Sequence, residues 1–215
     1  MGLMNIITNS TVICAAAAEK PEFSHEVLGS RFYSFPAKCA RRSGVMDSIP
    51  CLVPERFIDL VQVDKKLMFI GHMRSFNKRV DDSTRLIINV LVKNVSDKLY
   101  DETYNEVTLR GYVCKNPVYR KTPFGKEITD ILLAVNRSFG KSDYIPVIAW
   151  GRNARIASGL NVGDKLHIEG RLQSREYQKK INEEKVINKI AYEVSVSKLS
   201  VGDNNEQNSD EEELG

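Results

Sequence analysis

The feature that most constrains this chain is an internal repeat that covers most of its 215 residues. The second half aligns on the first at an offset of 96 residues. The matched pairs include Asn9 with Asn105, Pro21 with Pro117, Gly29 with Gly125, Arg41 with Arg137, Asp47 with Asp143, Pro50 with Pro146 and Arg56 with Arg152. After a three-residue insertion, Leu67, Gly71 and Ser75 match Leu166, Gly170 and Ser174. A repeat of this length predicts two consecutive units with the same fold.

Polar segments mark the boundaries of the two copies. Residues 96–104 form a polar linker, and after Val201 the chain becomes acidic and poor in apolar residues. A segment of that composition buries too little apolar surface to fold. We therefore expect one domain over residues 1–98, a second over residues 103–202 and a disordered acidic tail over residues 203–215.

The second copy shows the clearest order of elements. Alternating or apolar runs predict strands over residues 107–113, 128–136, 144–150, 166–177 and 191–199. A short helix is expected over residues 152–160, and residues 116–125 and 178–188 are expected to be loops. Three strands, one short helix and two further strands follow the order of a five-stranded OB barrel. The sequence therefore predicts an all-β chain of two tandem OB-fold barrels, each with one short helix.

Charge is distributed unevenly along the chain. Residues 1–104 carry a net charge of +2, residues 105–202 carry +7 and residues 203–215 carry −6. A basic body with an acidic tail suggests a polyanionic partner for the body. The alternative is an ordinary solvated charged surface, which net charge alone does not exclude.

Strand alternation places several aromatic side chains of the second copy on an outer surface, because successive residues of a strand point to opposite faces. Ile145, Val147 and Ala149 are expected inside the barrel, and Tyr144, Pro146, Ile148 and Trp150 outside it. Phe139 lies in a predicted hairpin turn over residues 139–143, where Asp143 is interpreted as a turn residue, and Tyr177 lies in the fourth strand. Exposed aromatic rings on a sheet are unfavourable unless something covers them.

Basic residues lie among these aromatics. The candidates for phosphate contacts are Arg110, Arg120, Lys121, Arg137, Arg152, Arg171, Arg175, Lys179 and Lys180. Rings that stack on unpaired bases contribute about 1–3 kcal/mol each, and stacking does not distinguish the bases. The combination therefore favours binding of a single nucleic-acid strand without sequence preference. The competing interpretation is that individual aromatics pack under a loop or at a subunit interface.

The second copy resembles the bacterial single-stranded DNA-binding protein family over nearly all of residues 105–200. The resemblance is carried by residues 105–111, 116–117, 131–135, 144–151 and 168–172, and residues 136–146 are similar to a two-domain version of the family. It implies that Phe139, Tyr144, Trp150 and Tyr177 stack on DNA bases during replication, recombination or repair. It also implies an assembly of four OB folds, hence a homodimer, with replication or repair proteins as further partners.

Two departures from the family pattern affect what the resemblance implies. The first copy has Ser43, Ser48, Pro54 and Lys78 at the four aromatic positions, and Ala15 in place of Gly111. We expect this copy to bind DNA weakly at most and mainly to pack on its partner domain or on another subunit. The tail ends in Glu213, Leu214 and Gly215 without the family's Pro-Phe pair, so we expect it to compete electrostatically for the basic groove rather than to recruit partners.

Several classes of function are not supported by the sequence. It shows no glycine-rich phosphate loop and no nucleophile elbow. Its cysteines and histidines lack metal-site spacing, so we expect free buried thiols, no metal and no cofactor. No apolar run approaches the length of a membrane helix, and residues 6–18 lack a preceding basic residue, so we expect a cytoplasmic, nucleoid-associated protein. We predict that it is not an enzyme. The alternatives are an OB-fold interaction scaffold of a primosome or replication complex, and a single-stranded RNA-binding protein.

Overall fold

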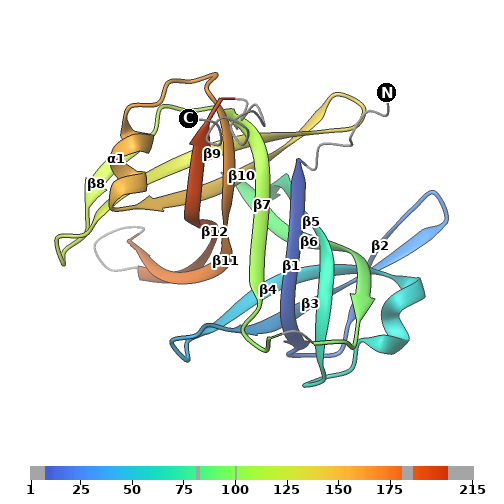
Figure 1. Cartoon of the computed structure of the whole chain (residues 1–215). Helices are drawn as coiled ribbons and strands as arrows, with labels where there is room; N and C mark the ends of the chain where they lie inside the picture. The colour runs from blue at the N-terminus through green and yellow to red at the C-terminus, as the bar shows by residue number, and fades with distance from the viewer. Residues whose placement is uncertain (1–7, 81–82, 100, 181–185, 203–215) are drawn as a thin grey trace, which may run out of the picture.

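The computed structural model describes residues 8–80, 83–99, 101–180 and 186–202, and strands make up most of it (Figure 1). The N-terminal half contains β1 (Asn9–Ala17), β2 (Glu22–Val27), β3 (Ser30–Ala40), β4 (Met46–Pro54), the 3-10 helix η1 (Glu55–Leu60), β5 (Lys66–Val80) and β6 (Ser83–Ser96). The C-terminal half contains β7 (Asn105–Val113), β8 (Val118–Lys121), β9 (Glu127–Arg137), β10 (Lys141–Trp150), α1 (Arg152–Ser158), β11 (Lys165–Lys180) and β12 (Val186–Val201). The two halves have the same order of elements.

Each half closes into a barrel with the same strand pairing. In the N-terminal barrel the order is β3-β4-β6-β5-β1, and β1 pairs back with β3. In the C-terminal barrel the order is β9-β10-β12-β11-β7, and β7 pairs back with β9. Five strands with a short helix after the third form an OB barrel, so the predicted fold of two tandem OB folds is confirmed.

Both barrels change register at a glycine of the repeat. The pairing of β5 with β6 shifts between Ile70 and Gly71, and that of β11 with β12 shifts between Glu169 and Gly170. A Cβ atom on Gly71 would lie 2.2 Å from the carbonyl oxygen of Leu91, and one on Gly170 would lie 2.4 Å from that of Ser195. The repeat retains glycine at both positions because the neighbouring backbone approaches too closely for any side chain.

The two barrels are joined by their first strands (Figure 1). β1 pairs antiparallel with β7, from Asn9 opposite Leu109 to Ile13 opposite Asn105. All twelve strands of the described residues therefore form one continuous sheet. The barrels are consecutive in the chain and are also joined by the hydrogen bonds between β1 and β7, so each barrel stabilises the first strand of the other.

The interior of each barrel is formed by the alternate apolar residues of its strands. The largest buried side chains include Ile13, Ile49 and Phe69 in the N-terminal barrel and Leu109, Ile145 and Ile168 in the C-terminal barrel. Cys39 is also fully buried, and desolvation raises the pKa of its thiol to about 11. All four cysteines are free.

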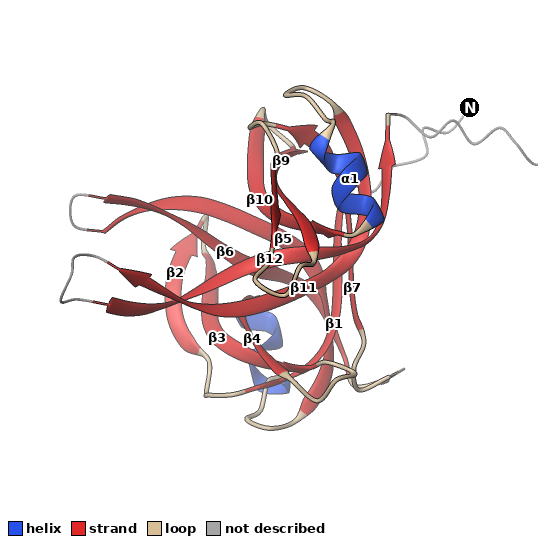
Figure 2. Cartoon of the chain, turned by 90° about the vertical axis from the view of Figure 1, so that its left-hand side faces the viewer, coloured by secondary structure: helices blue, strands red, loops and turns tan. Residues whose placement is uncertain are grey.

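Two segments predicted as loops contain strand structure, and the prediction was wrong there. Within residues 116–125, β8 pairs with β9 as a short hairpin. Within residues 178–188, β11 continues to Lys180 and β12 begins at Val186. The described parts of both segments make their backbone hydrogen bonds within hairpins, β8 with β9 and β11 with β12. Figure 2 shows the β5–β6 and β11–β12 hairpins projecting from the same side of the molecule.

Among the described residues, no helix has both the length and the apolar character needed to span a membrane. The predicted disordered tail, residues 203–215, lies outside the described residues.

Candidate nucleic-acid interface

Three of the four predicted aromatic residues share one outer face of the C-terminal barrel. Tyr144 and Trp150 lie on β10 with the same parity as Ile148, which is opposite Ser195 of β12. Ser195 is also opposite Arg171 of β11, and Tyr177 lies six residues further along that strand. Residues that are directly opposite, and alternate residues of one strand, point to the same face. We call this surface, formed by Tyr144, Trp150 and Tyr177, the platform; these rings are 42%, 37% and 37% exposed.

The fourth aromatic residue, Phe139, lies at the tip of the hairpin between β9 and β10. Its side chain is 98% exposed, and its φ of 64° lies in the left-handed region, followed by Gly140 with a φ of 67°. A phenylalanine in this conformation is uncommon, and its ring gains nothing from the protein core. A ring held in water at a hairpin tip is available to stack on a ligand.

Trp150 lies at the far end of β10 from Phe139, in a hollow of its own. Its indole N–H donates to the Ser195 hydroxyl oxygen at 3.1 Å, which fixes the orientation of the ring. The hollow has a volume of about 420 Å³ and is lined by Lys121, Gly125, Lys126, Glu127, Trp150 and Gly151. The β8–β9 hairpin, predicted as a loop, therefore places Lys121 beside the ring, where its ammonium group can meet a phosphate of a stacked nucleotide.

The arginines of this face are oriented by carboxylates. Arg175 lies 3.4 Å from Glu193, and its guanidinium carbon is 5.6 Å from the centre of the Tyr177 ring. Arg120 pairs with Asp130 at 2.7 Å, and this hydrogen bond raises the pKa of Arg120. A guanidinium has five donors, so a paired arginine still has N–H groups to offer to a phosphate.

Other predicted phosphate contacts lie apart from the platform or outside the description. Arg110 points outward from the central strand β7, beside His167 of β11. Burial, followed by the charge of Arg110, lowers the pKa of His167. Arg152 is exposed at the start of α1. Lys179 and Lys180 end β11, but their side chains lie outside the described part of the chain.

Two details of the expected face were wrong. Ile148 was expected outside with Trp150; it has the parity of that face, but it is only 2% exposed and so is not accessible there. Asp143 was interpreted as a turn residue, but the turn ends at Gly140 and Asp143 lies fully buried within β10. A buried carboxylate needs partners, and these come from the other barrel.

Asp143 is bound by residues of the N-terminal barrel. The backbone N–H of Ser75 donates to it at 2.7 Å, and the Arg74 guanidinium donates at 2.9 Å. Arg137 of its own barrel lies at 3.6 Å. The Ser75 hydroxyl oxygen in turn accepts the backbone N–H of Tyr144 at 2.6 Å. A residue of the first barrel therefore supports the backbone of the platform.

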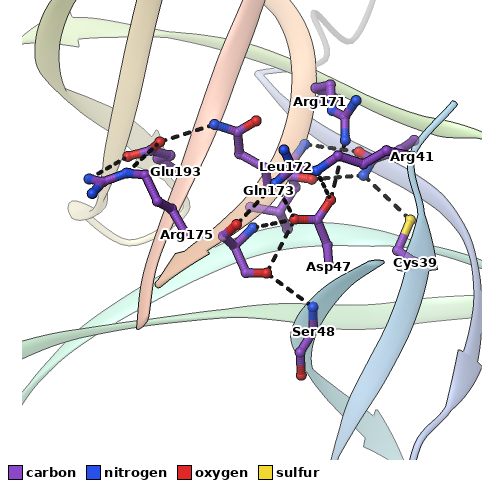
Figure 3. Close-up of polar contacts among 11 residues, drawn as sticks. Cys39, Arg41, Asp47, Ser48, Arg171, Leu172, Gln173, Arg175 and Glu193 are labelled. Atoms are coloured by element: carbon purple, nitrogen blue, oxygen red, sulfur yellow. Dashed lines mark hydrogen bonds and ion pairs between the residues drawn. The ribbon is translucent and has the colours of Figure 1, made fainter. Parts of the chain in front are cut away.

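Asp47 occupies the equivalent position on the other side of this contact (Figure 3). It accepts the backbone N–H of Ser174 at 2.7 Å and pairs with Arg41 at 2.7 Å and Arg171 at 3.2 Å. The Ser174 hydroxyl oxygen accepts the backbone N–H of Ser48 at 3.1 Å. We call these two pseudo-symmetric clusters the seam. Sequence reasoning missed it, although both aspartates and both serines are matched positions of the repeat.

Two comparisons by sequence identify the relatives of the chain. Residues 104–200 match the model of the single-strand binding protein family. The "Single-stranded DNA-binding protein 3" of Clostridium acetobutylicum is 31% identical over 115 residues, which cover 50% of this chain and 80% of that protein. The "Single-stranded DNA-binding protein" of Clostridium tetani is 39% identical over 83 residues, which cover 35% of this chain and 57% of that protein. The chain therefore spans little more than half the length of some of its relatives.

The fold of the whole chain is similar to that of a solved structure. The wild-type single-stranded DNA binding protein from Thermus aquaticus superposes with a TM-score of 0.71 at 19% identity, over 94% of this chain and 96% of that one. At this identity the likeness concerns the fold, and it extends to both barrels. The C-terminal barrel matches the family model, and a relative covered over four fifths of its length matches at 31% identity. The chain therefore belongs to the single-strand binding protein family.

Proposed function

We propose that this protein binds single-stranded DNA without sequence preference and protects it during replication, recombination or repair. The observation that carries the proposal is the platform: Tyr144, Trp150 and Tyr177 on one outer face, partly exposed and interleaved with arginines. Family membership and the names of the relatives support the same ligand. The C-terminal barrel, residues 103–202, is the main binding domain in this proposal.

Binding proceeds through two kinds of contact and requires no chemical step. Bases stack on Trp150, Tyr144, Tyr177 and Phe139, each contributing about 1–3 kcal/mol. Phosphates meet Lys121 near Trp150 and the remaining donors of Arg175 and Arg120. Because neutralised phosphates release counterions, affinity falls as salt rises. A protein that only binds in this way needs no catalytic residue, so we propose that it is not an enzyme.

The assembly proposed for the working protein is a homodimer with four OB folds, together with replication or repair proteins as partners. One chain supplies two barrels, and the resemblance of the C-terminal barrel to its family supports a unit of four. We also propose a cytoplasmic, nucleoid-associated location. Four free cysteines, three of them buried, fit a reducing compartment.

The test uses the single tryptophan as a probe. Trp150 fluorescence is recorded while an oligothymidine strand is added, at low and at high salt. Strong quenching that weakens with salt is the expected result, because a stacked base quenches the indole and salt competes for the phosphates. No quenching, combined with no binding in a gel-shift assay, would overturn the proposal and favour a scaffold whose aromatics contact a protein. A parallel titration with oligouridine distinguishes a DNA-binding from an RNA-binding protein.

A further inference from the structure

A large hollow lies between the two barrels, lined by residues of both and mostly by those of the N-terminal one. It has a volume of about 1170 Å³. Its N-terminal lining comes from β2 to β6, and two of these strands, β4 and β5, are the counterparts of β10 and β11, which carry the platform. The β9–β10 hairpin and β12 of the C-terminal barrel form part of its wall. We call this hollow the interdomain groove.

The described residues that line the interdomain groove carry charge of one sign. Five basic residues line it: Arg74, Arg85, Arg137, Lys141 and Lys189. None of the described residues that line it is acidic. Asp143 is shared by Arg74 and Arg137, but it lies fully buried beneath them, so the cluster keeps a positive charge toward the groove. A basic concave surface without carboxylates fits a polyanion.

The same groove exposes rings and apolar side chains. Phe76 on β5 is 49% exposed, and Phe32 on β3 stacks on His25 with ring centres 5.2 Å apart. Tyr192 of β12 lines the opposite wall. Neither phenylalanine lies at a position equivalent to Phe139, Tyr144, Trp150 or Tyr177, where the N-terminal copy has Ser43, Ser48, Pro54 and Lys78. Apolar lining with basic residues at the rim fits a chain of bases with phosphates outside.

The interdomain groove adjoins the residues of the platform. Ser75 lines the groove, and its hydroxyl oxygen accepts the backbone N–H of Tyr144. Lys189 also lines the groove and is directly opposite Tyr177 across the β11–β12 ribbon. The groove and the platform are therefore close neighbours in the fold.

We propose that the interdomain groove is a second binding site for the same single DNA strand, in which Phe76, Phe32 and Tyr192 contact bases and Arg85, Lys141 and Lys189 contact phosphates. The inference rests on the proposed function and extends it to the copy whose platform aromatics are missing. Residues of both barrels form the site, so it requires the arrangement of the barrels that the seam and the β1–β7 pairing maintain. A short strand is held by the platform alone, whereas a longer strand occupies the platform and the groove together.

The experiment compares two strand lengths on the full chain. Dissociation constants are measured for oligothymidines of about 8 and about 30 nucleotides, lengths that bracket one and two OB folds at about 4–16 nucleotides each. The test variant is Phe76→Ala with Arg85→Ala. The matched control is Phe23→Ala with Lys65→Ala, which removes an exposed ring and an exposed ammonium group of the same barrel that do not line the groove.

The expected result is a change in the preference for the longer strand. In the test variant the ratio of affinities, long over short, falls about tenfold or more, and the control keeps the ratio of the unchanged protein within about twofold. An unchanged ratio in the test variant overturns the inference. If the unchanged protein binds neither strand and Trp150 is not quenched, the proposed function fails and the groove proposal fails with it.

A second measurement needs no substitution and so does not depend on how a variant folds. A 30-nucleotide strand containing 5-iododeoxyuridine is cross-linked to the unchanged protein by light, and the modified peptides are identified by mass spectrometry. Cross-links at Phe76, Phe32 or Tyr192 support the proposal. Cross-links confined to the platform and the Phe139 hairpin overturn it.

Discussion

The N-terminal and C-terminal barrels have kept the same residues where they touch each other and have diverged where they face outward. Asp47 and Asp143 are both fully buried, and each accepts a backbone N–H from a serine of the other barrel. A change at either aspartate leaves a buried N–H of the other barrel unsatisfied. Asn9 and Asn105, on the paired strands β1 and β7, also make the same pair of hydrogen bonds, each within its own barrel, to the backbone of Met73 and of Leu172.

The outward faces of the two barrels are not constrained by buried hydrogen bonds of this kind. Ser48 stands where the C-terminal barrel has Tyr144, and Pro54 stands where it has Trp150. In the opposite direction, Phe76 stands where the C-terminal barrel has Arg175. An exposed ring can be lost or moved without leaving a buried group unpaired, so the two faces were free to differ. The two copies therefore share the buried residues that join the barrels, and they differ in the exposed residues that could bind a ligand.

A smaller difference lies in the first strands. A Cβ on Gly111 would lie 2.4 Å from the carbonyl oxygen of Ala134, yet the equivalent position of the N-terminal barrel is Ala15. The closing pairs of both barrels have the same register, Tyr112 opposite Ala134 and Ala16 opposite Lys38. The N-terminal barrel therefore closes with enough space for one extra methyl group at this point.

The largest expected effect concerns the seam and treats the two barrels alike. Asp47→Ala and Asp143→Ala should each lower the free energy of unfolding by about 3–5 kcal/mol, because each leaves arginines and a buried N–H without their partner. Denaturant unfolding of the full chain measures this. Glu26→Ala is the control: it breaks an exposed pair with Arg31 and should cost about 1 kcal/mol or less. If only one of the two aspartate variants loses stability, the two clusters of the seam are not equivalent in energy.

The next effect should separate the two barrels. Trp150→Ala is expected to weaken binding of a short oligothymidine by about 1–3 kcal/mol, because one stacking ring is removed. Phe23→Ala removes an even more exposed ring of the N-terminal barrel and should leave this affinity unchanged. Fluorescence anisotropy of a labelled oligonucleotide measures both. Equal losses for the two variants would contradict a dominant role of the C-terminal platform.

A third pair of variants compares equivalent serines of the seam. Ser75→Ala and Ser174→Ala each remove one hydroxyl acceptor and should cost a similar free energy of unfolding, about 1 kcal/mol. Only Ser75 accepts the N–H of Tyr144, so only Ser75→Ala should also weaken binding of short strands. Unfolding and anisotropy titrations on the same preparations test this. The idea fails if Ser174→Ala weakens binding as much as Ser75→Ala does.

The smallest effect concerns one histidine from each half. Burial lowers the pKa of His72 and of His167 below the ordinary value of 6.5. Both are therefore neutral in the folded state at pH 7, and the unfolded chain takes up protons first as the pH falls. The free energy of unfolding that depends on these two neutral histidines is therefore retained above pH 6.5 and decreases as the pH falls below it. Unfolding at pH 7.5 and pH 5.5 measures the decrease, and a double variant, His72→Asn with His167→Asn, should reduce it. If the double variant loses as much stability between pH 7.5 and pH 5.5 as the unchanged protein, the loss comes from protonation of carboxylates and not from the histidines.

The architecture of two OB barrels could be predicted from the amino-acid sequence alone. The repeat, the alternation of apolar residues and the position of the short helix predicted two OB barrels, because strand periodicity and turn residues are local properties that one chain displays without its neighbours. The same alternation predicted that Tyr144, Trp150 and Tyr177 share a face, and the strand register places them on one. Their role in binding DNA stays a prediction.

The seam, the projecting hairpins and the interdomain groove could not be predicted from the sequence, because they depend on contacts between residues far apart in the chain. The sequence around Asp143 is typical of a turn, and nothing nearby shows that Ser75 and Arg74 of the other barrel will meet it. β8 and the paired ends of β11 and β12 are polar, so their sequence lacks the apolar pattern of a barrel strand. The interdomain groove is lined by residues of both barrels, so it also depends on how they pack together. A buried carboxylate is stable only where donors converge on it, and here that convergence requires the two barrels to be packed together.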